Sequence, residues 1–270
     1  MEQLKGKVFN VLDHGSIELI DWMGSDVDIC CAARISTGGA TKTPEEDARL
    51  ISYLVENVHT SPFEMCEIKL KIKMPLFIAR QWLRHRMASV NEYSGRYSEM
   101  KDEFYVPDVF RKQSMNNHQG SEGEFDNQTN LKFSKTIDVY SRDTFTLYQH
   151  FIDQGVSREM SRIVLPLSTY TSFFWKIDLH NLLKFLKLRM DPTAQEEIRV
   201  YADKIWEIVK TWVPITAKAF EDHHLNSKTF SSEEILFLSE MLKKVPDGEK
   251  FIKESHLKKR WKDKLLELLK

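Results

Sequence analysis

A thirteen-residue segment from Arg84 to Arg96, RHRMASVNEYSGR, concentrates side chains that bind anions. It holds three arginines and a histidine beside two serines, an asparagine and a glutamate. Guanidinium groups bind phosphate through two parallel hydrogen bonds, and serine, asparagine and glycine favour turns that expose backbone N–H groups. Glu92 could pair with an arginine, or accept from ribose hydroxyls or a base N–H. A nucleotide and a dinucleotide cofactor bound side by side would use this set of groups.

The position of Arg86 argues against an ordinary solvated helix in this segment. On a helix spanning residues 77–87, one polar arc would hold Gln81, Arg84 and His85, and Arg86 would fall in the middle of the opposite, apolar arc. A solvated surface would explain the polar arc. It would not explain Arg86, because an unpaired buried charge is very costly. Either the helix ends before Arg86, or this face meets a ligand or another subunit.

Length and composition bound the remaining alternatives. The chain of 270 residues can bury one large core or two small ones, and 29% charged with 41% hydrophobic residues is ordinary for a soluble protein. A net charge of −1 gives no global attraction to nucleic acid or membrane, so an anion site must be local. No signal peptide, membrane span or CxxC motif is evident, and we expect a cytoplasmic protein with Cys30 and Cys31 as reduced core thiols. Neither a Walker loop, a Rossmann glycine pattern nor a metal motif is present.

Local patterns predict an α+β fold: a central, mostly antiparallel sheet packed with long helices, plus a helical C-terminal extension. Strands are expected within residues 7–22 around a turn at 14–16, at 66–74 and at 169–178. Helices are expected at 25–36, 43–59, from 75 toward 87, at 131–155, 179–190 and 193–213, and beyond Pro214.

Two stretches carry the clearest local patterns. Thr43, Pro44 and Glu46 form a capping box with proline at the first helical position. Residues 66–74 alternate between apolar and mostly charged side chains, which predicts a strand with one buried face. Residues 112–130 are polar and aperiodic, and we expect them to form a mobile surface loop.

The spacing RHRxxSxNExSxR resembles the signature of the flavin-dependent thymidylate synthases. The chain matches all eight fixed positions of that signature, namely Arg84, His85, Arg86, Ser89, Asn91, Glu92, Ser94 and Arg96. Further blocks resemble the family in the expected order: AARIS (32–36), HTSPFE (59–64), ARQWLRHR (79–86), SRIVLPL (161–167) and LKLRMDPTAQEEIRVYA (186–202). The resemblance implies a family domain over residues 1–220 and a helical extension over 221–270.

The resemblance also implies an activity and an assembly. The enzyme would convert dUMP to dTMP with methylenetetrahydrofolate as carbon donor and NADPH-reduced FAD as electron source, and would release tetrahydrofolate. FAD would be the cofactor, with NADPH and methylenetetrahydrofolate as co-substrates. The family forms homotetramers with FAD and substrate in clefts built from several subunits, which would account for Arg86. No nucleic-acid, membrane or metal partner is implied.

Site residues carry over by position. The resemblance assigns dUMP binding to Gln81, Trp82, Leu83, Arg84, Glu92, Tyr93, Ser94, Gly95, Arg96, Arg162 and Arg189. Arg162 would come from another subunit, and Arg189 would be the catalytic residue that stabilises the uracil N3 anion. The resemblance assigns FAD binding to Ser61, Arg84, His85, Arg86, Glu92, Asp178, His180 and Lys184, and folate binding to His59. Asp178, His180 and Lys184 depart from the family's usual asparagine, arginine, and asparagine or histidine.

Three other interpretations remain open at this stage. A basic helix with Trp82, Tyr93 and Tyr97 nearby could bind nucleic acid by stacking bases, although the neutral net charge and Glu92 weigh against it. The chain could instead be a non-catalytic flavoprotein or assembly subunit that keeps the fold. Taken alone, Arg189 could also be an ordinary cation at a helix C-terminus. A flavin spectrum that NADPH bleaches would distinguish a working flavoenzyme from the nucleic-acid alternative.

Overall fold

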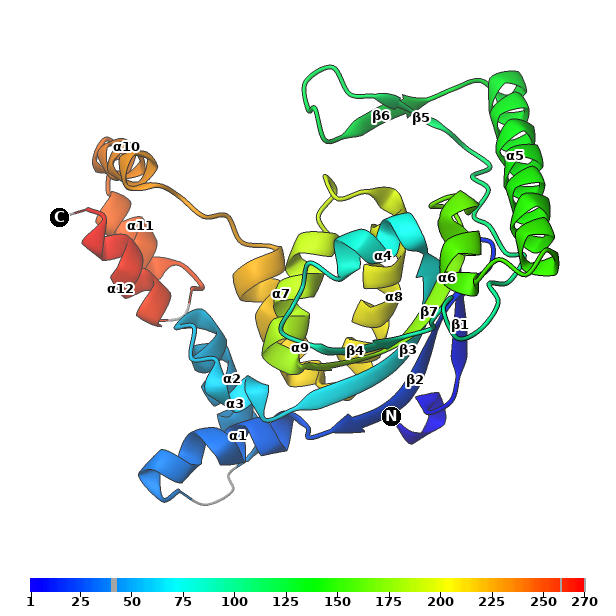
Figure 1. Ribbon diagram of the computed structural model, residues 1–270. Coiled ribbons are helices and arrows are strands. Elements are labelled where there is room, and N and C mark those ends of the chain that lie inside the picture. The colour runs from blue at the N-terminus through cyan, green and yellow to red at the C-terminus, as the bar shows by residue number, and fades with distance from the viewer. Residues whose placement is uncertain (40–42, 258, 270) are drawn as a thin grey trace. The chain divides into compact units, whose positions relative to one another are not determined.

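The computed structural model describes residues 1–39, 43–257 and 259–269, which form two compact units, 1–225 and 226–270. The first unit contains a five-stranded sheet and most of the helices (Figure 1). The regular elements in the described residues of the second unit are the helices α10 (Ser232–Lys243), α11 (Gly248–Glu254) and α12 (Lys259–Glu267). The predicted α+β class with a helical C-terminal part is therefore confirmed.

The sheet has the strand order β1-β2-β3-β7-β4, and every neighbouring pair is antiparallel. Its strands are β1 (Val8–Val11), β2 (Gly15–Met23), β3 (Glu67–Pro75), β4 (Ser89–Glu92) and β7 (Tyr170–Asp178). The predicted alternation in β3 is confirmed, because Ile68, Leu70, Ile72 and Met74 are all buried. The register joins Leu70 to Trp175 and Ile72 to Phe173, so apolar side chains stand opposite each other at the centre of the sheet.

The predicted pair of strands around a turn is confirmed, but the turn lies at residues 12–14 instead of 14–16, because Gly15 and Ser16 belong to β2 and Gly15 pairs with Val11. A side chain at Gly15 would collide with the hydroxyl of Tyr201, which donates to the carbonyl of Lys73 at 2.7 Å. Glycine is therefore used here for a close approach to a neighbouring ring, and not for turn geometry.

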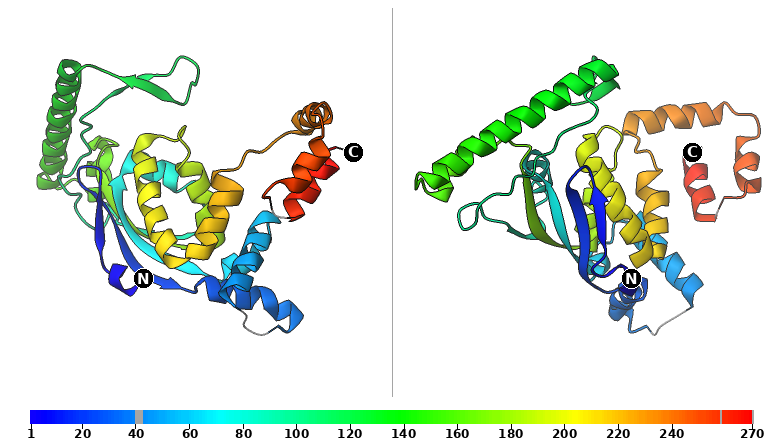
Figure 2. Two further views of the ribbon diagram at one scale, coloured as in Figure 1. Left: turned by 180° about the vertical axis from the view of Figure 1, so that it is seen from behind. Right: turned by 90° about the vertical axis from the view of Figure 1, so that its right-hand side faces the viewer.

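Helices α4, α7 and α8 cover one face of the sheet (Figures 1 and 2). The helices of the first unit are α1 (Asp26–Arg34), α2 (Pro44–Glu56), α3 (Ser61–Glu64), α4 (Leu76–Trp82), α5 (Asn127–Asp153), α6 (Arg158–Ser161), α7 (Leu179–Arg189), α8 (Glu196–Trp212) and α9 (Pro214–Phe220). Shorter helical turns are η1 (Glu2–Leu4), η2 (Ile35–Thr37), η3 (Arg162–Val164) and the π-helical turn η4 (Glu221–Leu225). Within the described ranges, no helix combines the length and apolar character needed to cross a membrane.

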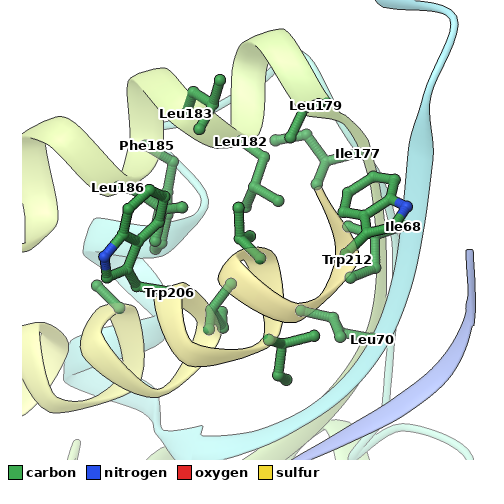
Figure 3. Close-up of a cluster of buried hydrophobic side chains, with 14 of the residues drawn as sticks. Ile68, Leu70, Ile177, Leu179, Leu182, Leu183, Phe185, Leu186, Trp206 and Trp212 are labelled. Atoms are coloured by element: carbon green, nitrogen blue, oxygen red, sulfur yellow. The ribbon is translucent and has the colours of Figure 1, made fainter. Parts of the chain in front are cut away.

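The main core lies between the sheet and these helices. Figure 3 shows Ile68 and Leu70 of β3 facing the apolar stripes of α7 and α8, with Phe185 and Trp206 among them. The large apolar side chains in this layer are almost completely buried, and each such burial contributes roughly 1.5–3 kcal/mol. The opposite face of the sheet exposes Lys69, Lys71, Phe174 and Lys176.

Two sequence-based expectations about local structure are wrong. Residues 112–130 contain most of an antiparallel ribbon, β5 (Arg111–Gln113) with β6 (Ser121–Glu124), and the beginning of α5. The ribbon is held by a distant contact, because Arg111 Nη2 donates to both oxygens of Glu197 at 2.7 and 2.8 Å. Cys31 is exposed whereas Cys30 is buried, since consecutive helical residues project about 100° apart.

A buried carboxylate connects α1 to α9 through hydrogen bonds. Asp26, at the start of α1, accepts from the backbone N–H groups of Ile215 and Thr216 at 2.9 Å and from the Thr216 hydroxyl at 2.6 Å. The proline that begins α9 cannot donate, so Asp26 satisfies the next two backbone donors of that helix end. The capping box of Thr43 and Glu46 at the start of α2 is confirmed.

Replacing Asp26 with alanine should lower the free energy of unfolding by about 2–4 kcal/mol, because it leaves several buried donors without a partner. Asp28→Ala is the matched control, since Asp28 lies two residues away and its exposed side chain accepts a hydrogen bond from half-buried Ser25. Urea unfolding followed by tryptophan fluorescence measures both variants. Equal losses in the two variants would contradict the role given to Asp26.

Candidate active site

The end of α4 separates the core from the basic segment that begins at Arg84. Trp82, the last residue of α4, is fully buried against Trp175 and Phe185, with ring centroids 4.9 and 4.4 Å away. The helix ends there, and Arg84 and Arg86 are exposed. Of the two explanations offered for Arg86, the structure shows the first, that the helix ends before this residue. Among the described residues, neither arginine forms an ion pair, so both guanidinium groups can receive an anionic ligand.

Helix α7 brings Arg189 to the end of α4. Arg189 Nε donates to His85 Nε2 at 3.0 Å, and Nη2 donates to the carbonyl of Gln81 at 3.5 Å. Arg189 follows buried Phe185 by four residues, and the His85 ring also contacts Phe185 with centroids 4.9 Å apart. Gln81, His85 and Arg189 are called the α4–α7 cluster below.

The α4–α7 cluster combines a cation with a neutral imidazole. His85 Nε2 accepts a hydrogen bond, so the ring carries its proton on Nδ1. Burial, together with the charge of Arg189, lowers the pKa of His85 to about 4. Burial also lowers the pKa of Arg189 from its ordinary value, although a guanidinium stays protonated at neutral pH.

Five of the residues predicted to bind dUMP line a second feature, a cavity of about 440 Å³. They are Glu92, Tyr93, Ser94, Gly95 and Arg162, and we call this feature the 92–95 cavity. Glu92 Oε1 accepts from the Thr171 hydroxyl at 2.7 Å. A side chain at buried Gly95 would lie 2.9 Å from Met100 Sδ and 3.3 Å from Arg162 Cδ, so glycine lets the chain approach Arg162. Arg96 lies outside the cavity lining and pairs with Glu159 at 3.1 Å.

These two groups lie at opposite ends of α4 within one chain. Leu76, the first residue of α4, lines the 92–95 cavity, whereas Gln81 near its other end belongs to the α4–α7 cluster. Gln81 follows Leu76 by five positions, which corresponds to a rise of roughly 7.5 Å along the helix. One chain therefore presents seven of the eleven predicted dUMP residues in two groups, one at each end of α4.

A third feature is a cavity of about 190 Å³ that contains residues predicted to bind FAD and folate, and we call it the third cavity. His59, His180 and Lys184 lie at its edge, together with Lys187 and His224. Its apolar lining comes from α2, α3, α7, α9 and the connection between α2 and α3: Leu54, Val55, Val58, Phe63, Leu183 and Phe220. Burial, and then the charge of Lys184, lowers the pKa of His180 below its ordinary value.

Two residues of this third cavity were missed from the sequence. Lys187 could have been found, because it follows His180 by seven residues and so shares its face of α7. His224 lies in the π-helical turn and carried no pattern that would mark it. Asp178 caps α7 by accepting from the Asn181 backbone at 2.9 Å and from its side chain at 2.8 Å. Ser61 is exposed at the first position of α3.

One of the three aromatic residues in the nucleic-acid alternative is unavailable for stacking, whereas Tyr93 and Tyr97 are exposed. Trp82 was one of the proposed base-stacking residues, and its side chain is fully buried, so any contact it makes with a nucleotide must come from its backbone. Leu83 beside it is half-buried. Across the parts of the chain that the structure describes, no three histidine, cysteine, aspartate or glutamate side chains meet as a metal site requires.

Comparisons with known proteins agree with the sequence signature. The family model described as "Thymidylate synthase complementing protein" matches residues 18–215. Proteins named flavin-dependent thymidylate synthase are 48% identical in Wolbachia pipientis, over 96% of this chain and 91% of that one, and 51% identical in Thermus thermophilus, over 86% and 85%. The crystal structure of a UMP/dUMP methylase, PolB from Streptomyces cacaoi, bound with 5-Br dUMP superposes with a TM-score of 0.73 at 28% identity, covering 80% of this chain and 98% of that one. The fold and site thus define an enzyme of the methyltransferase class. The chain belongs to the flavin-dependent thymidylate synthase family.

The lowered pKa of His85 predicts a pH dependence of stability. The folded-state pKa of about 4 lies below the ordinary value of 6.5, so on acidification the unfolded chain takes up this proton first. Stability present above pH 6.5 should therefore be lost as the pH falls toward 4. His85→Gln should make that loss smaller, while His180 and His224, whose pKa values are also lowered, keep part of it.

The measurement is urea unfolding of both proteins at several pH values between 7 and 4.5. His118→Gln serves as the control, because His118 is exposed in the connection between β5 and β6. If His85→Gln and the unaltered protein lose stability in parallel, His85 does not carry the neutral role given to it.

Proposed function

We propose that this protein methylates dUMP to dTMP, with methylenetetrahydrofolate as the carbon donor and NADPH-reduced FAD as the electron source, and releases tetrahydrofolate. The observation that carries the proposal is the bond between Arg189 and neutral His85 at the end of α4, beside the segment that matches the family signature. Family membership and the structural likeness to a dUMP methylase support the same reaction.

The proposed role of Arg189 follows from the chemistry of uracil. The C5 atom is a weak nucleophile, and negative charge developing at N3 pushes electron density into the ring. A guanidinium held in place before the reaction stabilises that charge without reorganisation. His85 orients Arg189 by accepting from Nε, and because burial keeps the imidazole neutral it adds no second positive charge.

The donor set fits FAD as a ligand. Exposed Arg84 and Arg86 suit a pyrophosphate, and the third cavity combines an apolar lining with His180 and Lys184 at its edge. Ser61 and Glu92 would complete the contacts, whereas Asp178 has both oxygens engaged in capping α7 and would act by holding that helix. Bound FAD would supply the electrons that convert the transferred carbon to a methyl group. We place folate next to His59, at the edge of the same cavity.

We infer that complete active sites form between copies in a homotetramer. One chain presents the α4–α7 cluster and the 92–95 cavity at opposite ends of α4. In the proposed assembly, a single dUMP would contact the cluster of one copy and the cavity with Arg162 of another. The family resemblance supports the same arrangement. A cytoplasmic location fits three cysteines that are all free.

Arg189→Ala should leave the protein folded and FAD bound but slow dTMP formation by well over tenfold, since about 1.4 kcal/mol of lost transition-state stabilisation is a factor of ten. Arg189→Lys should rescue poorly, because an ammonium lacks the planar fork. The measurement is single-turnover dTMP formation by pre-reduced enzyme at saturating dUMP and methylenetetrahydrofolate. A wild-type rate in Arg189→Ala would remove it as the activating residue, and no dTMP from the unaltered enzyme would refute the reaction itself.

Subunits carrying Arg189→Ala and subunits carrying Arg162→Ala should complement each other. Each variant alone should be nearly inactive, whereas co-expressed mixed oligomers, purified through two different tags, should regain roughly a quarter of the wild-type activity, because each site draws one residue from each of two randomly paired copies. Co-expression of two differently tagged Arg189→Ala chains is the control. Mixed oligomers as inactive as that control would place both arginines in a site built from one chain.

A further inference from the structure

A cavity of about 360 Å³ beside α5 contains none of the residues assigned above to dUMP, FAD or folate. It lies between α5, residues 105–110, the segment before β7 and the start of α8, and we call it the α5 cavity. Its walls are largely aromatic and include Phe77, Tyr105, Phe110 and Tyr140. The rings of Phe77 and Tyr105 already stack on each other, with centroids 5.9 Å apart and an angle of 29° between their planes.

Ser141 gives the α5 cavity a buried polar group without a partner. Its side chain is 1% exposed, and its hydroxyl forms no hydrogen bond with any described residue. Hydroxyls inside helices usually bond to a carbonyl one turn earlier, and Thr136 and Thr146 of α5 do so at 2.8 and 2.9 Å. Ser141 departs from this behaviour, and burying an unpaired hydroxyl is costly unless something else satisfies it.

Glu197 adds a buried acceptor to the same cavity. Its side chain is almost fully buried, and both oxygens accept from Arg111 Nη2 of the β5–β6 ribbon. Oε1 also accepts from the Tyr105 hydroxyl at 3.4 Å, whereas among the described residues Arg111 is the one donor to Oε2. A carboxylate can accept about four hydrogen bonds, so Oε2 can take another N–H donor from a ligand.

We propose that the α5 cavity binds a flat heteroaromatic ring that carries a hydrogen-bond donor next to an acceptor on one edge, as nucleobases and nicotinamide do. The ring faces stack on the aromatic walls, the acceptor accepts a hydrogen bond from the Ser141 hydroxyl, and the N–H donates to Glu197 Oε2. The volume is at the small end of ligand pockets, which suits a single ring system and not a whole dinucleotide. This inference does not depend on the proposed reaction.

The variant Ser141→Ala tests whether the Ser141 hydroxyl binds a ligand or stabilises the fold. The hydroxyl has no partner among the described residues, so its removal should leave the melting temperature unchanged or slightly higher. The same change should weaken ring binding at least tenfold. Tyr140→Ala, which removes an exposed part of the aromatic wall, is the second variant, and Asp143→Ala, exposed elsewhere on α5, is the matched control.

The probes are uridine, adenosine and nicotinamide riboside, titrated into the full-length protein in the presence of saturating dUMP and FAD, which occupy the sites proposed above, and followed by saturation-transfer difference NMR. At least one should bind saturably to the unaltered protein and to Asp143→Ala, and should bind at least tenfold more weakly to Ser141→Ala. The preferred probe identifies the source of the ring. If uridine is bound, N3-methyluridine, which lacks the N–H, should bind much more weakly. No saturable binding of any probe, or equal binding to Ser141→Ala, would overturn the proposal.

Discussion

The contact between Trp82 of α4 and Phe185 of α7 is the constraint on which the reactive end of the molecule depends. Their ring centroids lie 4.4 Å apart, and both side chains are fully buried. His85 follows Trp82 by three residues and Arg189 follows Phe185 by four, so the aromatic contact brings their side chains within hydrogen-bonding distance. Removing either aromatic ring would open a cavity that typically costs 3–5 kcal/mol, which means that the geometry of the reactive groups is supported by the core itself.

Electrostatic repulsion limits the number of positive charges near the end of α4. Arg84, Arg86 and Arg189 all lie near the end of α4, and a protonated His85 would add a fourth positive charge. Burial prevents this by lowering the pKa of His85, so the ring stays neutral and its Nε2 accepts a hydrogen bond from Arg189. The remaining cations are exposed or half-buried, where water screens them until an anionic ligand arrives.

Sequence reasoning succeeded where the determinant is local. The alternation in β3 and the capping box at α2 depend on residues a few positions apart, and the signature from Arg84 to Arg96 is a continuous segment. It failed where distant residues decide. The β5–β6 ribbon depends on a bond between Arg111 and Glu197, 86 residues apart, and the end of α4 depends on aromatic neighbours from β7, α7 and α8.

Some residues of the candidate site could be found from local sequence patterns, and others could not. His180 and Lys184 share a helix face, so Lys187 could have been added to them from spacing alone. His224 and the α5 cavity could not, because no local pattern relates the π-helical turn to α7, or Ser141 to Glu197. The division of the dUMP residues between two ends of α4 likewise required coordinates, because residues 81–96 are continuous in sequence.

Strand β4 lies at the edge of the sheet, where it has a single neighbouring strand and all four of its residues are exposed. Side chains in such a position take part in little of the packing that maintains the fold. Their identities are therefore free to follow ligand chemistry, and a substitution there can alter substrate preference while the protein remains folded. A change at Trp82 has no such freedom, because folding and geometry are altered together. Evolution toward a related pyrimidine substrate would accordingly proceed through the edge strand and the segment after it sooner than through α4.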